Sequence, residues 1–278
     1  MTRIAQASYP QYSGPPAPRA PLGGRRIRVG FWSSYIRRHT ITKLFGAWMT
    51  GLDPERFEVF VFAGGLVHDE ASKEIEAGVE HFHRCPQVDA DALAAIADAA
   101  LDVLVFPDIG MDPKTQLVAA LRLAPVQCMG WGHPVTSGLP AIDHMLSSEL
   151  QEPADGDAHY SERLVRLPNL SISVPMPPLA PDRTIARDPE APNDEVVYLS
   201  AQSLYKSVPR YDDIYAHIAA EVPSARFWFI ADRLDYATER FRARLEGAFA
   251  ARGLDAARFC DIKGRLDQDA FYDLNRQA

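Results

Sequence analysis

The sequence predicts an α/β protein with two parallel sheets, the second of them incomplete. Apolar, β-branched runs alternate with helical stretches about every 25–35 residues, the pattern of βαβ units. This alternation stops at a proline-rich stretch, residues 175–192, and begins again after it, as expected for a linker between two domains. Only three apolar runs follow the linker, whereas a complete doubly wound sheet needs about five or six strands.

Length, charge and cysteine content limit the class of protein. The 278 residues allow one large domain or two modest domains, since a domain usually has about 100–200 residues. The formal net charge of −8, without a segregated basic region, predicts no nucleic-acid partner, and no apolar stretch is long enough to predict a membrane partner. Cys85, Cys128 and Cys260 lack the spacing of a zinc site or a disulfide framework, which predicts no metal and a reduced, cytoplasmic location.

The first domain is predicted over residues 26–180. Residues 1–25 are rich in Pro, Gly, Ser and Ala, and we expect them to form a flexible leader. Apolar runs predict strands at residues 27–34, 57–62, 79–83, 102–106 and from 124 onward. Helical spacing predicts helices at residues 42–49, 89–99 and 115–123. Residues 141–180 are less regular, with short apolar runs at 144–146 and 163–168.

The second domain is predicted over residues 181–278. Its expected strands are residues 196–199, 225–230 and 258–262, and its expected helices are residues 211–220, 237–251 and a last helix from 267. In the first of these helices, Ile214, Ile218 and Ala219 are expected to face inward. The last strand is expected to be short of partners, as in a chain that is cut short, which would favour self-association.

The loop that follows the run at residue 124 is the first candidate ligand site. Ligands bind at the carboxyl ends of strands in open α/β sheets. Glycines let a ligand approach the backbone, and successive amides with hydroxyl side chains donate to its oxygens. The candidate residues of this loop are Gly132, His133, Pro134, Thr136 and Ser137. A tight structural turn, with His133 bound to a neighbouring carbonyl, explains the same residues equally well.

Two further candidates each follow the first strand of a domain. His39 comes after the run at residues 27–34, and Lys206, which could reach a phosphate, comes after the run at 196–199. Taken alone, an exposed histidine and a solvated loop lysine are the commoner interpretations. Asp108, Asp112 and Asp143 lie near strand ends without the paired spacing of general acid–base catalysis. Gly-x-Gly-x-x-Gly, Walker, Gly-x-Ser-x-Gly and HExxH motifs do not occur in the sequence.

Several motifs occur together in a specific order. They are Arg-Ile-Arg-Val-Gly-Phe at 26–31 with Ser33, Ser34 and His39, Ala-Pro-Val-Gln at 124–127, Gly-His-Pro-Val-Thr-Ser-Gly at 132–138 with Asp143, His-Tyr-Ser-Glu-Arg-Leu at 159–164, and Leu-Tyr-Lys at 204–206. In this order they resemble the catalytic region of the O-GlcNAc transferase and SPINDLY family, glycosyltransferase family 41. The resemblance runs from about residue 26 to the end of the chain.

The resemblance implies a GT-B architecture, with two Rossmann-like halves and the nucleotide sugar held mainly by the second, here incomplete, half. It implies transfer of a GlcNAc-type or related hexose from a donor such as UDP-GlcNAc to Ser or Thr hydroxyls of an acceptor protein, without a metal or other cofactor. His39 would lie at the mouth of the active site, and Lys206 would contact the diphosphate. The loop at 132–138 would line the sugar pocket, and Gln202 would bind the donor. Tetratricopeptide repeats, upstream or in a partner, would present the acceptor.

The sequence departs from the family pattern at several places. Tyr35 stands where the eukaryotic enzymes have an aspartate, and Pro-Asp-Ile-Gly-Met-Asp-Pro at 107–113 replaces their Asn-Gly-Tyr-Thr, which points to a bacterial branch. No tetratricopeptide repeat precedes Arg26, and the late Gly-His-Thr-Thr-Gly element that grips the nucleotide does not occur. We therefore expect an incomplete donor site. The alternative hypothesis is a catalytically incomplete fragment that acts as a protein-binding module.

Overall fold

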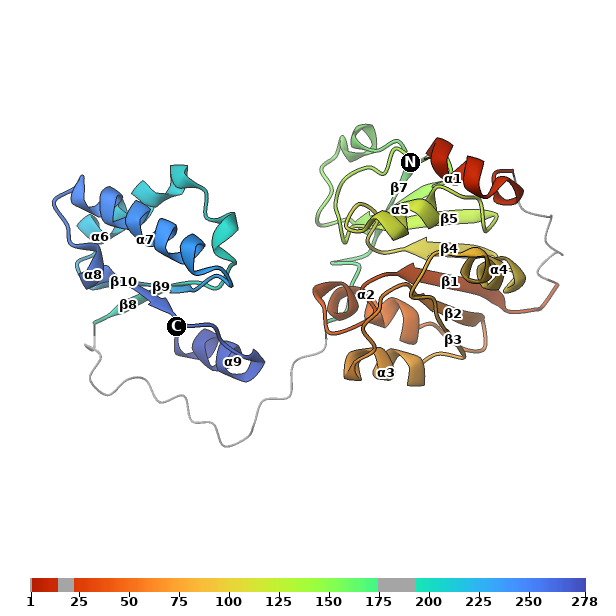
Figure 1. Cartoon of the computed structure of the whole chain (residues 1–278), viewed down its shortest axis with the longest axis horizontal. Coiled ribbons are helices and arrows are strands. Elements are labelled where there is room, and N and C mark those ends of the chain that lie inside the picture. The colour runs from red at the N-terminus through yellow and green to blue at the C-terminus, as the bar shows by residue number, and fades with distance from the viewer. Residues whose placement is uncertain (1, 15–22, 175–193) are drawn as a thin grey trace. The chain divides into compact units, whose positions relative to one another are not determined.

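The computed structural model describes residues 2–14, 23–174 and 194–278. The chain forms two compact units, Met1–Pro177 and Pro178–Ala278, and each contains one parallel sheet (Figure 1). The linker expected at 175–192 and part of the expected leader, residues 15–22, lie outside the described residues. Within the described ranges, no helix is both long enough and apolar enough to cross a membrane.

The first unit confirms the predicted parallel sheet. Its strands are β1 (Ile27–Ser33), β2 (Phe57–Ala63), β3 (His81–Arg84), β4 (Val103–Phe106), β5 (Val126–Gly130), β6 (His144–Ser148) and β7 (Arg163–Leu167). They pair in the order β3-β2-β1-β4-β5-β6-β7, every pair parallel. The strand order reverses between β1 and β4, and this switch point is where ligands bind in doubly wound sheets.

Strands β6 and β7 lie in the region that the sequence predicts to be irregular. Each has five residues, and β6 pairs in parallel with β5 on one side and β7 on the other. The polar residues Ser147 and Ser148 are nevertheless buried in β6, and their hydroxyls bond to Glu152 and to the Asn169 carbonyl. Apolar periodicity does not reveal a strand whose buried positions are serines satisfied by distant partners.

In the first unit, the α-helices that follow the first strand begin at side-chain caps. They are α1 (Thr2–Ser8), α2 (Thr40–Thr50), α3 (Glu70–Ala77), α4 (Ala90–Asp98) and α5 (Pro113–Ala119), with short 3₁₀ turns η1 (Pro10–Tyr12) and η2 (Gly156–His159). Asp69, Asp89 and Asp112 cap α3, α4 and α5. Helix α5 ends before the predicted residue 123, because the Gln127 side chain accepts from the backbone N–H groups of Leu123 and Ala124.

The first residues differ from the flexible leader that composition predicts. Residues 2–12 form α1 and η1, in which Ala5 is fully buried and Tyr9 and Tyr12 pack against the core. The Tyr9 hydroxyl donates to the Val88 carbonyl at 3.3 Å, and the Arg122 N–H donates to the Tyr12 carbonyl at 2.8 Å. The prediction is therefore wrong for residues 2–12. Three anchors are enough to dock a short segment, but too few to produce a periodic pattern.

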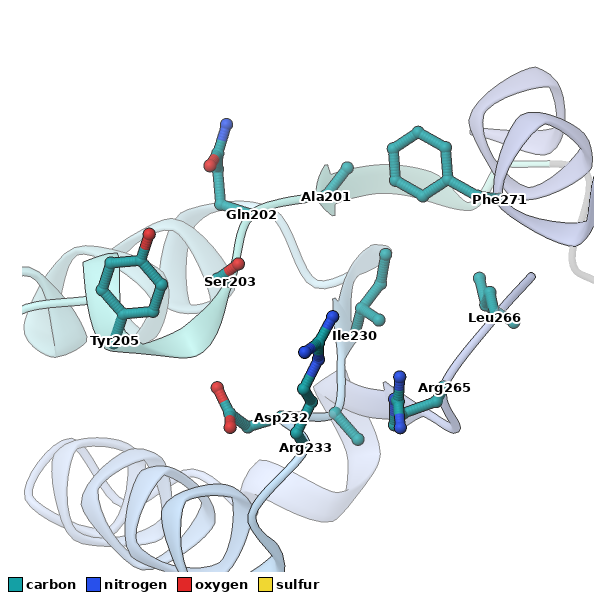
Figure 2. Close-up of a pocket in the computed structure, with 11 residues that line it drawn as sticks. Ala201, Gln202, Ser203, Tyr205, Ile230, Asp232, Arg233, Arg265, Leu266 and Phe271 are labelled. Atoms are coloured by element: carbon teal, nitrogen blue, oxygen red, sulfur yellow. The ribbon is translucent and has the colours of Figure 1, made fainter. Parts of the chain in front are cut away.

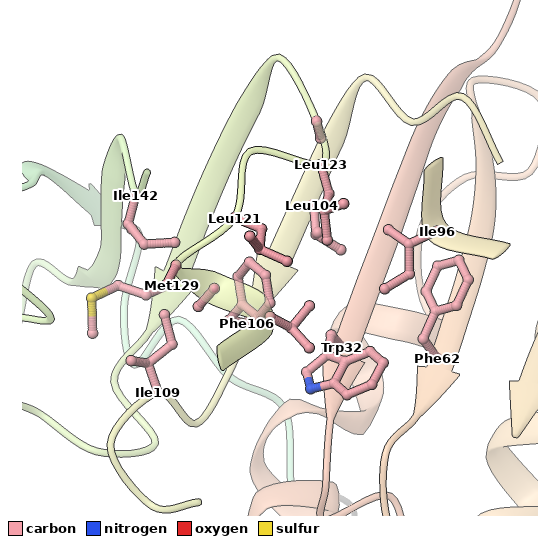
Figure 3. Packing of buried hydrophobic residues seen from close by; sticks show 14 of the residues in the cluster. Trp32, Phe62, Ile96, Leu104, Phe106, Ile109, Leu121, Leu123, Met129 and Ile142 are labelled. Carbon is pink, nitrogen blue, oxygen red and sulfur yellow. The ribbon is translucent and has the colours of Figure 1, made fainter. Parts of the chain in front are cut away.

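Two apolar clusters cover the two faces of the first sheet. Alternate residues of β1 reach opposite faces, so Trp32 belongs to one cluster and Phe31 to the other. Figure 3 shows the first of these, where Trp32 and Phe106 from neighbouring strands meet Ile96 from helix α4. Burial on both faces is typical of a parallel sheet and fixes the carboxyl ends of β1, β4 and β5 relative to one another.

The second unit has a three-stranded parallel sheet in the order β10-β9-β8. Its elements are β8 (Val196–Ser200), η3 (Leu204–Lys206), η4 (Pro209–Tyr211), α6 (Asp212–Glu221), β9 (Ala225–Ile230), α7 (Asp235–Ala250), α8 (Ala256–Phe259), β10 (Cys260–Lys263) and α9 (Gln268–Gln277). Ile214, expected to face inward, is 48% exposed, because α6 buries the face that carries Asp212, Ala216 and Ala219. On that face, Arg244 of α7 pairs with the Asp212 carboxylate at 2.7 Å.

Candidate active site

The turns after β1 and β4 are joined by hydrogen bonds at the switch point of the first unit. The Ser33 hydroxyl donates to Asp108 Oδ2 at 3.0 Å and accepts from the Tyr35 N–H at 2.9 Å. The Tyr35 hydroxyl in turn donates to the Met111 carbonyl at 3.0 Å. These bonds hold the segment that leads to His39 against the turn that follows β4.

His39 lies at the first turn of α2 and is half-buried. The Ile41 N–H donates to His39 Nδ1 at 3.1 Å, so the imidazole caps the helix. The ring stacks on Tyr35 with centroids 4.4 Å apart. Burial and the charge of Arg37 lower the pKa of His39. The side chain is therefore an ordered part of the switch point and not a solvated surface histidine.

Asp108 is a fully buried carboxyl at the end of β4. Its Oδ2 accepts from Ser33, whereas its Oδ1 has no hydrogen-bond partner among the described residues. Burial raises the pKa of Asp108 to about 7, with a smaller contribution from the charge of Asp112 and an opposing one from the Ser33 hydrogen bond. Because the carboxyl is inaccessible, it orders the two turns and does not meet a ligand.

Gly132 allows the 132–138 loop to pack closely on its neighbours. The Gly132 N–H donates to the Pro107 carbonyl at 2.9 Å, and a Cβ at Gly132 would lie 2.6 Å from Ile41 Cδ1. The His133 ring covers Gly110, whose φ of +99° also favours glycine. Gly132 thus brings the loop against α2 and the turn after β4, as the structural interpretation of this glycine expects.

The hydroxyls of Thr136 and Ser137 point to Glu162 inside the protein. Thr136 Oγ1 donates to Glu162 Oε2 at 2.7 Å, and the Ser137 N–H donates to Oε1 at 3.0 Å, joined there by the Ser137 hydroxyl. Burial alone would raise the pKa of Glu162, but these donors outweigh it and lower that pKa. A ligand at this loop would meet backbone groups and the exposed Pro134 and Val135.

Two motif residues have structural partners. The buried Gln127 amide accepts from Leu123 and Ala124 and donates to the carbonyls of Leu121 and Ala141. Asp143 accepts from the two terminal guanidinium nitrogens of Arg122, at 2.6 and 3.1 Å. It also accepts from the Gln127 N–H at 2.8 Å. Both side chains order the chain on either side of β5, and neither remains available to a ligand.

The second unit has a pocket of about 500 Å³ at the carboxyl ends of its three strands (Figure 2). Its lining residues are Ala201, Gln202, Ser203 and Tyr205 after β8, Ile230, Ala231, Asp232 and Arg233 at the end of β9, and Arg265, Leu266 and Phe271 after β10. The volume lies within the usual range for small-molecule sites, about 300–1,000 Å³. The pocket contains Gln202, which the sequence predicts as a donor-binding residue.

Lys206 is exposed on η3, and its Nζ lies 6.0 Å from the ring centroid of Tyr205, a pocket residue. Lys206 itself does not line the pocket. Two arginines that sequence reasoning missed do so: Arg233 and Arg265 both have guanidinium groups beside the strand ends in Figure 2. The signal for them was available, because each lies nearer to the end of an expected strand than Lys206 does.

One group of side chains in the described part of the chain has the composition of a metal site, namely Glu58, Glu80 and His81. Arg28 Nε donates to Glu58 at 3.1 Å, and Arg26 forms a two-pronged contact with Glu80. The two guanidinium groups compensate the carboxylate charges, and His81 Nε2 bonds to the remaining oxygen of Glu58 at 3.0 Å. This cluster is therefore explained as an ion-pair network on β1, β2 and β3.

Comparison with known proteins places this geometry in a family. The family model described as glycosyl transferase family 41 matches residues 3–172. The chain is 26% identical over 219 residues to a probable UDP-N-acetylglucosamine–peptide N-acetylglucosaminyltransferase, SEC, of Arabidopsis thaliana, covering 75% of this chain and 22% of that protein. It is also 25% identical over 257 residues to the probable transferase SPINDLY of rice, Oryza sativa, covering 90% of this chain and 27% of that protein.

Solved structures show the same fold. A mutant O-GlcNAc transferase of Thermobaculum terrenum superposes with a TM-score of 0.77 at 23% identity, covering 98% of this chain and 52% of that one. The chain thus spans about a quarter of the plant relatives and half of the bacterial protein. A Rickettsia africae glycosyltransferase superposes with a TM-score of 0.52 at 9% identity, covering 90% of this chain and 70% of that one. With two parallel-sheet units of the GT-B class and a family match over most of the first unit, the chain belongs to glycosyl transferase family 41.

Proposed function

We propose that this chain is a protein O-glycosyltransferase. It binds a nucleotide sugar such as UDP-GlcNAc and transfers a GlcNAc-type or related hexose to a Ser or Thr hydroxyl of an acceptor protein. Membership of family 41 supports this proposal, as do the names of the plant relatives, which are probable UDP-N-acetylglucosamine–peptide transferases. The turn at 107–113 supports a bacterial-type member.

The pocket of the second unit carries the proposal. It has the volume of a small-molecule site, and Arg233 and Arg265 bring two positive charges to the ends of parallel strands. Guanidinium groups match the oxygens of a diphosphate, and Lys206 adds a charge at the edge of the pocket. These cations would stabilise the charge that develops on the leaving nucleoside diphosphate, so the reaction would need no metal.

The first unit would supply the groups around the transferred sugar and the acceptor. Ile41, whose N–H donates to His39, packs against Gly132, so the first turn of α2 and the loop at 132–138 would contribute together. The backbone of that loop and the exposed Pro134 are the groups that it offers to a ligand. An acceptor protein, presented by tetratricopeptide repeats in the same polypeptide or in a partner, completes the proposed reaction. A cytoplasmic location is consistent with three free cysteines.

Calorimetric titration of the chain with UDP-GlcNAc, UDP and GDP sugars tests the proposal. We expect one of these nucleotides to bind. Arg265→Ala should weaken the affinity about tenfold or more, because a hydrogen bond to a charged group contributes about 1.5–3 kcal/mol. Lys206→Ala should weaken it less, since Lys206 lies outside the pocket lining. Arg240→Ala, an exposed arginine of α7, is the matched control and should leave binding unchanged.

Transfer is measured by mass spectrometry of a Ser/Thr-rich acceptor peptide incubated with the nucleotide sugar that binds. A mass increase of one hexosamine or hexose, lost in Arg265→Ala and kept in Arg240→Ala, supports the proposal. If none of these nucleotides binds at millimolar concentration, the proposed transferase function is refuted and the protein-binding alternative is favoured.

A further inference from the structure

We propose that the hydrogen bond between Ser33 and Asp108 is a proton-controlled latch between the turns after β1 and β4. The latch is closed while the Asp108 carboxyl is protonated, and it opens to water when that carboxyl is ionised. The proposal goes beyond the proposed function, because it concerns the order of the switch point and needs no substrate. Its evidence is the place of Asp108 between the two turns, its second carboxyl oxygen, and the charges around it.

Asp108 connects the two turns through its side chain. It follows β4, and its Oδ2 accepts the hydroxyl of Ser33, the last residue of β1, at 3.0 Å. Ser33 Oγ also accepts the Tyr35 N–H at 2.9 Å. The Tyr35 hydroxyl returns to the turn after β4, where it donates to the Met111 carbonyl at 3.0 Å. A change in the bond between Ser33 and Asp108 therefore reaches the segment that leads to α2.

The surroundings satisfy the neutral carboxyl better than the ionised one. Asp108 is fully buried, and its Oδ1 has no hydrogen-bond partner among the described residues. A neutral carboxyl carries one proton, here on Oδ1, because Oδ2 accepts from Ser33. An ionised carboxyl has about four lone-pair sites, of which this place serves one. Since a buried charge without partners is strongly unfavourable, ionisation of Asp108 favours an arrangement that lets water reach Oδ1.

The charges around Asp108 also oppose its ionisation. The described part of the chain offers Asp108 no ion-pair partner, and Lys114 Nζ donates to the Pro86 carbonyl instead, at 2.6 Å. Burial raises the pKa of Asp108 to about 7, the Ser33 bond opposes this rise, and the carboxylate of Asp112 adds to it. The other titratable side chains on the segments around this carboxyl are Tyr35, Arg37, Arg38 and His39 after β1, His68 and Asp69 after β2, and His133 after β5.

Water that enters here would meet further polar atoms. Trp32 Nε1 on β1 and Thr115 Oγ1 in the first turn of α5 are also buried without a partner among the described residues. Figure 3 shows the Trp32 indole beside Phe106, the last residue of β4. The Ser34 hydroxyl ties the end of β1 to α5, because it donates to the helix cap Asp112 at 3.2 Å. A buried water needs about 2–4 polar partners, and the three elements that meet here provide them.

Nuclear magnetic resonance of the labelled full chain between pH 5 and pH 9 tests the latch. The ¹³Cγ shift of Asp108, assigned by its loss in Asp108→Asn, reports the proton, and hydrogen exchange of the Tyr35 N–H reports the turn. We expect an Asp108 midpoint near pH 7. The Tyr35 protection factor should fall about tenfold between pH 6 and pH 8, because the ionised fraction of a group with that pKa rises about tenfold. The protection factor of Phe227 in β9 of the other sheet should not change.

Three variants separate the latch from other effects of pH. Asparagine has the size of aspartate and does not ionise, so Asp108→Asn should keep the Tyr35 protection of the wild type at pH 6 over the whole range. Asp98→Asn, an exposed position of α4, is the matched control and should keep the pH dependence of the wild type. Ser33→Ala removes the donor that lowers the pKa of Asp108, so the Asp108 midpoint should move to higher pH.

Two outcomes in the wild type alone would overturn the proposal. One is an Asp108 midpoint below pH 5, which would mean that the closed arrangement holds the ionised carboxyl. The other is a Tyr35 protection factor that stays constant while Asp108 titrates. In Asp108→Asn, a fall of the Tyr35 protection equal to that of the wild type would also refute the latch. None of these measurements involves a nucleotide, so failure of the proposed function would leave them unaffected.

Discussion

Ser137 donates both its backbone N–H and its hydroxyl to the carboxylate of Glu162, which lies 25 residues further along the chain. Thr136 adds a third donor, at 2.7 Å. Glu162 is 4% exposed, so an ionised group is held inside the protein by the loop that it organises. The shape of the candidate ligand loop therefore depends on a residue just before β7 as much as on its own glycines.

Glu162→Gln should destabilise the first unit by about 2 kcal/mol, because an amide cannot accept all of the hydrogen bonds that the carboxylate accepts. Urea unfolding measures the change. The matched control is Glu74→Gln, an exposed glutamate of α3, which should change the free energy of unfolding by less than about 0.5 kcal/mol. Equal effects of the two substitutions would contradict this account of the loop.

The contribution of Glu162 to the free energy of unfolding should depend on pH. The pKa of Glu162 is lowered in the folded protein, so its carboxylate stabilises the fold above the pKa of the unfolded chain, about 4.3. This stabilisation is lost as the pH falls through the lower folded-state value. The difference in unfolding free energy between the wild type and Glu162→Gln should therefore shrink between pH 6 and pH 3. A difference that stays constant over this range would exclude the carboxylate as its origin.

Asp108→Asn should stabilise the protein at pH 8. The pKa of Asp108 is raised to about 7, so between about pH 4 and pH 7 the folded protein holds a proton that the unfolded chain has released. Stability due to this group therefore falls as the pH rises through that window. Asparagine has the same size without the charge, and the gain at pH 8 should be at least about 1 kcal/mol, since one pKa unit corresponds to about 1.4 kcal/mol.

The same substitution should have little effect at pH 4, where the folded-state carboxyl is already protonated. Thermal melts of the wild type, Asp108→Asn and the exposed control Asp98→Asn at both pH values provide the measurement. A stabilisation by Asp108→Asn that is equal at pH 4 and pH 8 would show that Asp108 is not protonated in the fold.

Ser171→Gly should be less destabilising than Ser171→Ala. The Trp131 indole N–H donates to Ser171 Oγ at 2.9 Å, and the Trp48 indole N–H donates to its carbonyl at 2.6 Å. Both variants lose the hydroxyl, at a cost of about 1 kcal/mol. Ser171 has φ +59°, however, a conformation that costs a residue with a Cβ about 1 kcal/mol and glycine almost nothing.

Tryptophan fluorescence during urea unfolding follows both variants, because Trp48 and Trp131 are two of the four tryptophans of the chain. The exposed Ser173→Ala is the control and should unfold like the wild type. If the alanine and glycine variants unfold at the same urea concentration, the left-handed conformation of Ser171 does not contribute.

Gly132→Ala should destabilise the first unit by about 1–3 kcal/mol, the usual cost of overpacking. The added Cβ would meet the Pro107 carbonyl and Ile41, the residue whose N–H donates to His39. Gly247→Ala is the opposite case: a Cβ there meets no atom within 4 Å, and α7 should gain about 0.5–1 kcal/mol. Differential scanning calorimetry compares the two, and a neutral Gly132→Ala would contradict the close approach of the loop to α2.

Local pattern was enough to predict the α/β class, most of the strands and the positions of the candidate loops. Apolar runs such as Phe57–Ala63 and Ala225–Ile230 form parallel strands with buried residues, as their pattern predicts. The same pattern missed β6, where buried serines replace apolar residues, and the docking of α1, which depends on a few side chains. It misplaced Ile214 because α6 buries the face that carries Asp212, whose partner Arg244 lies on another helix.

By itself, the sequence determined which residues lie at the carboxyl ends of the strands, because the ends of apolar runs are local and the motif order is specific to family 41. Only the tertiary structure decided what those residues do there. It directs the Thr136 and Ser137 hydroxyls to Glu162, leaves Asp108 Oδ1 without a partner among the described residues and brings the Ile41 N–H to His39 Nδ1. The physical reason is that a hydrogen-bond partner is chosen by proximity in the folded sheet, and spacing along the chain does not encode that proximity.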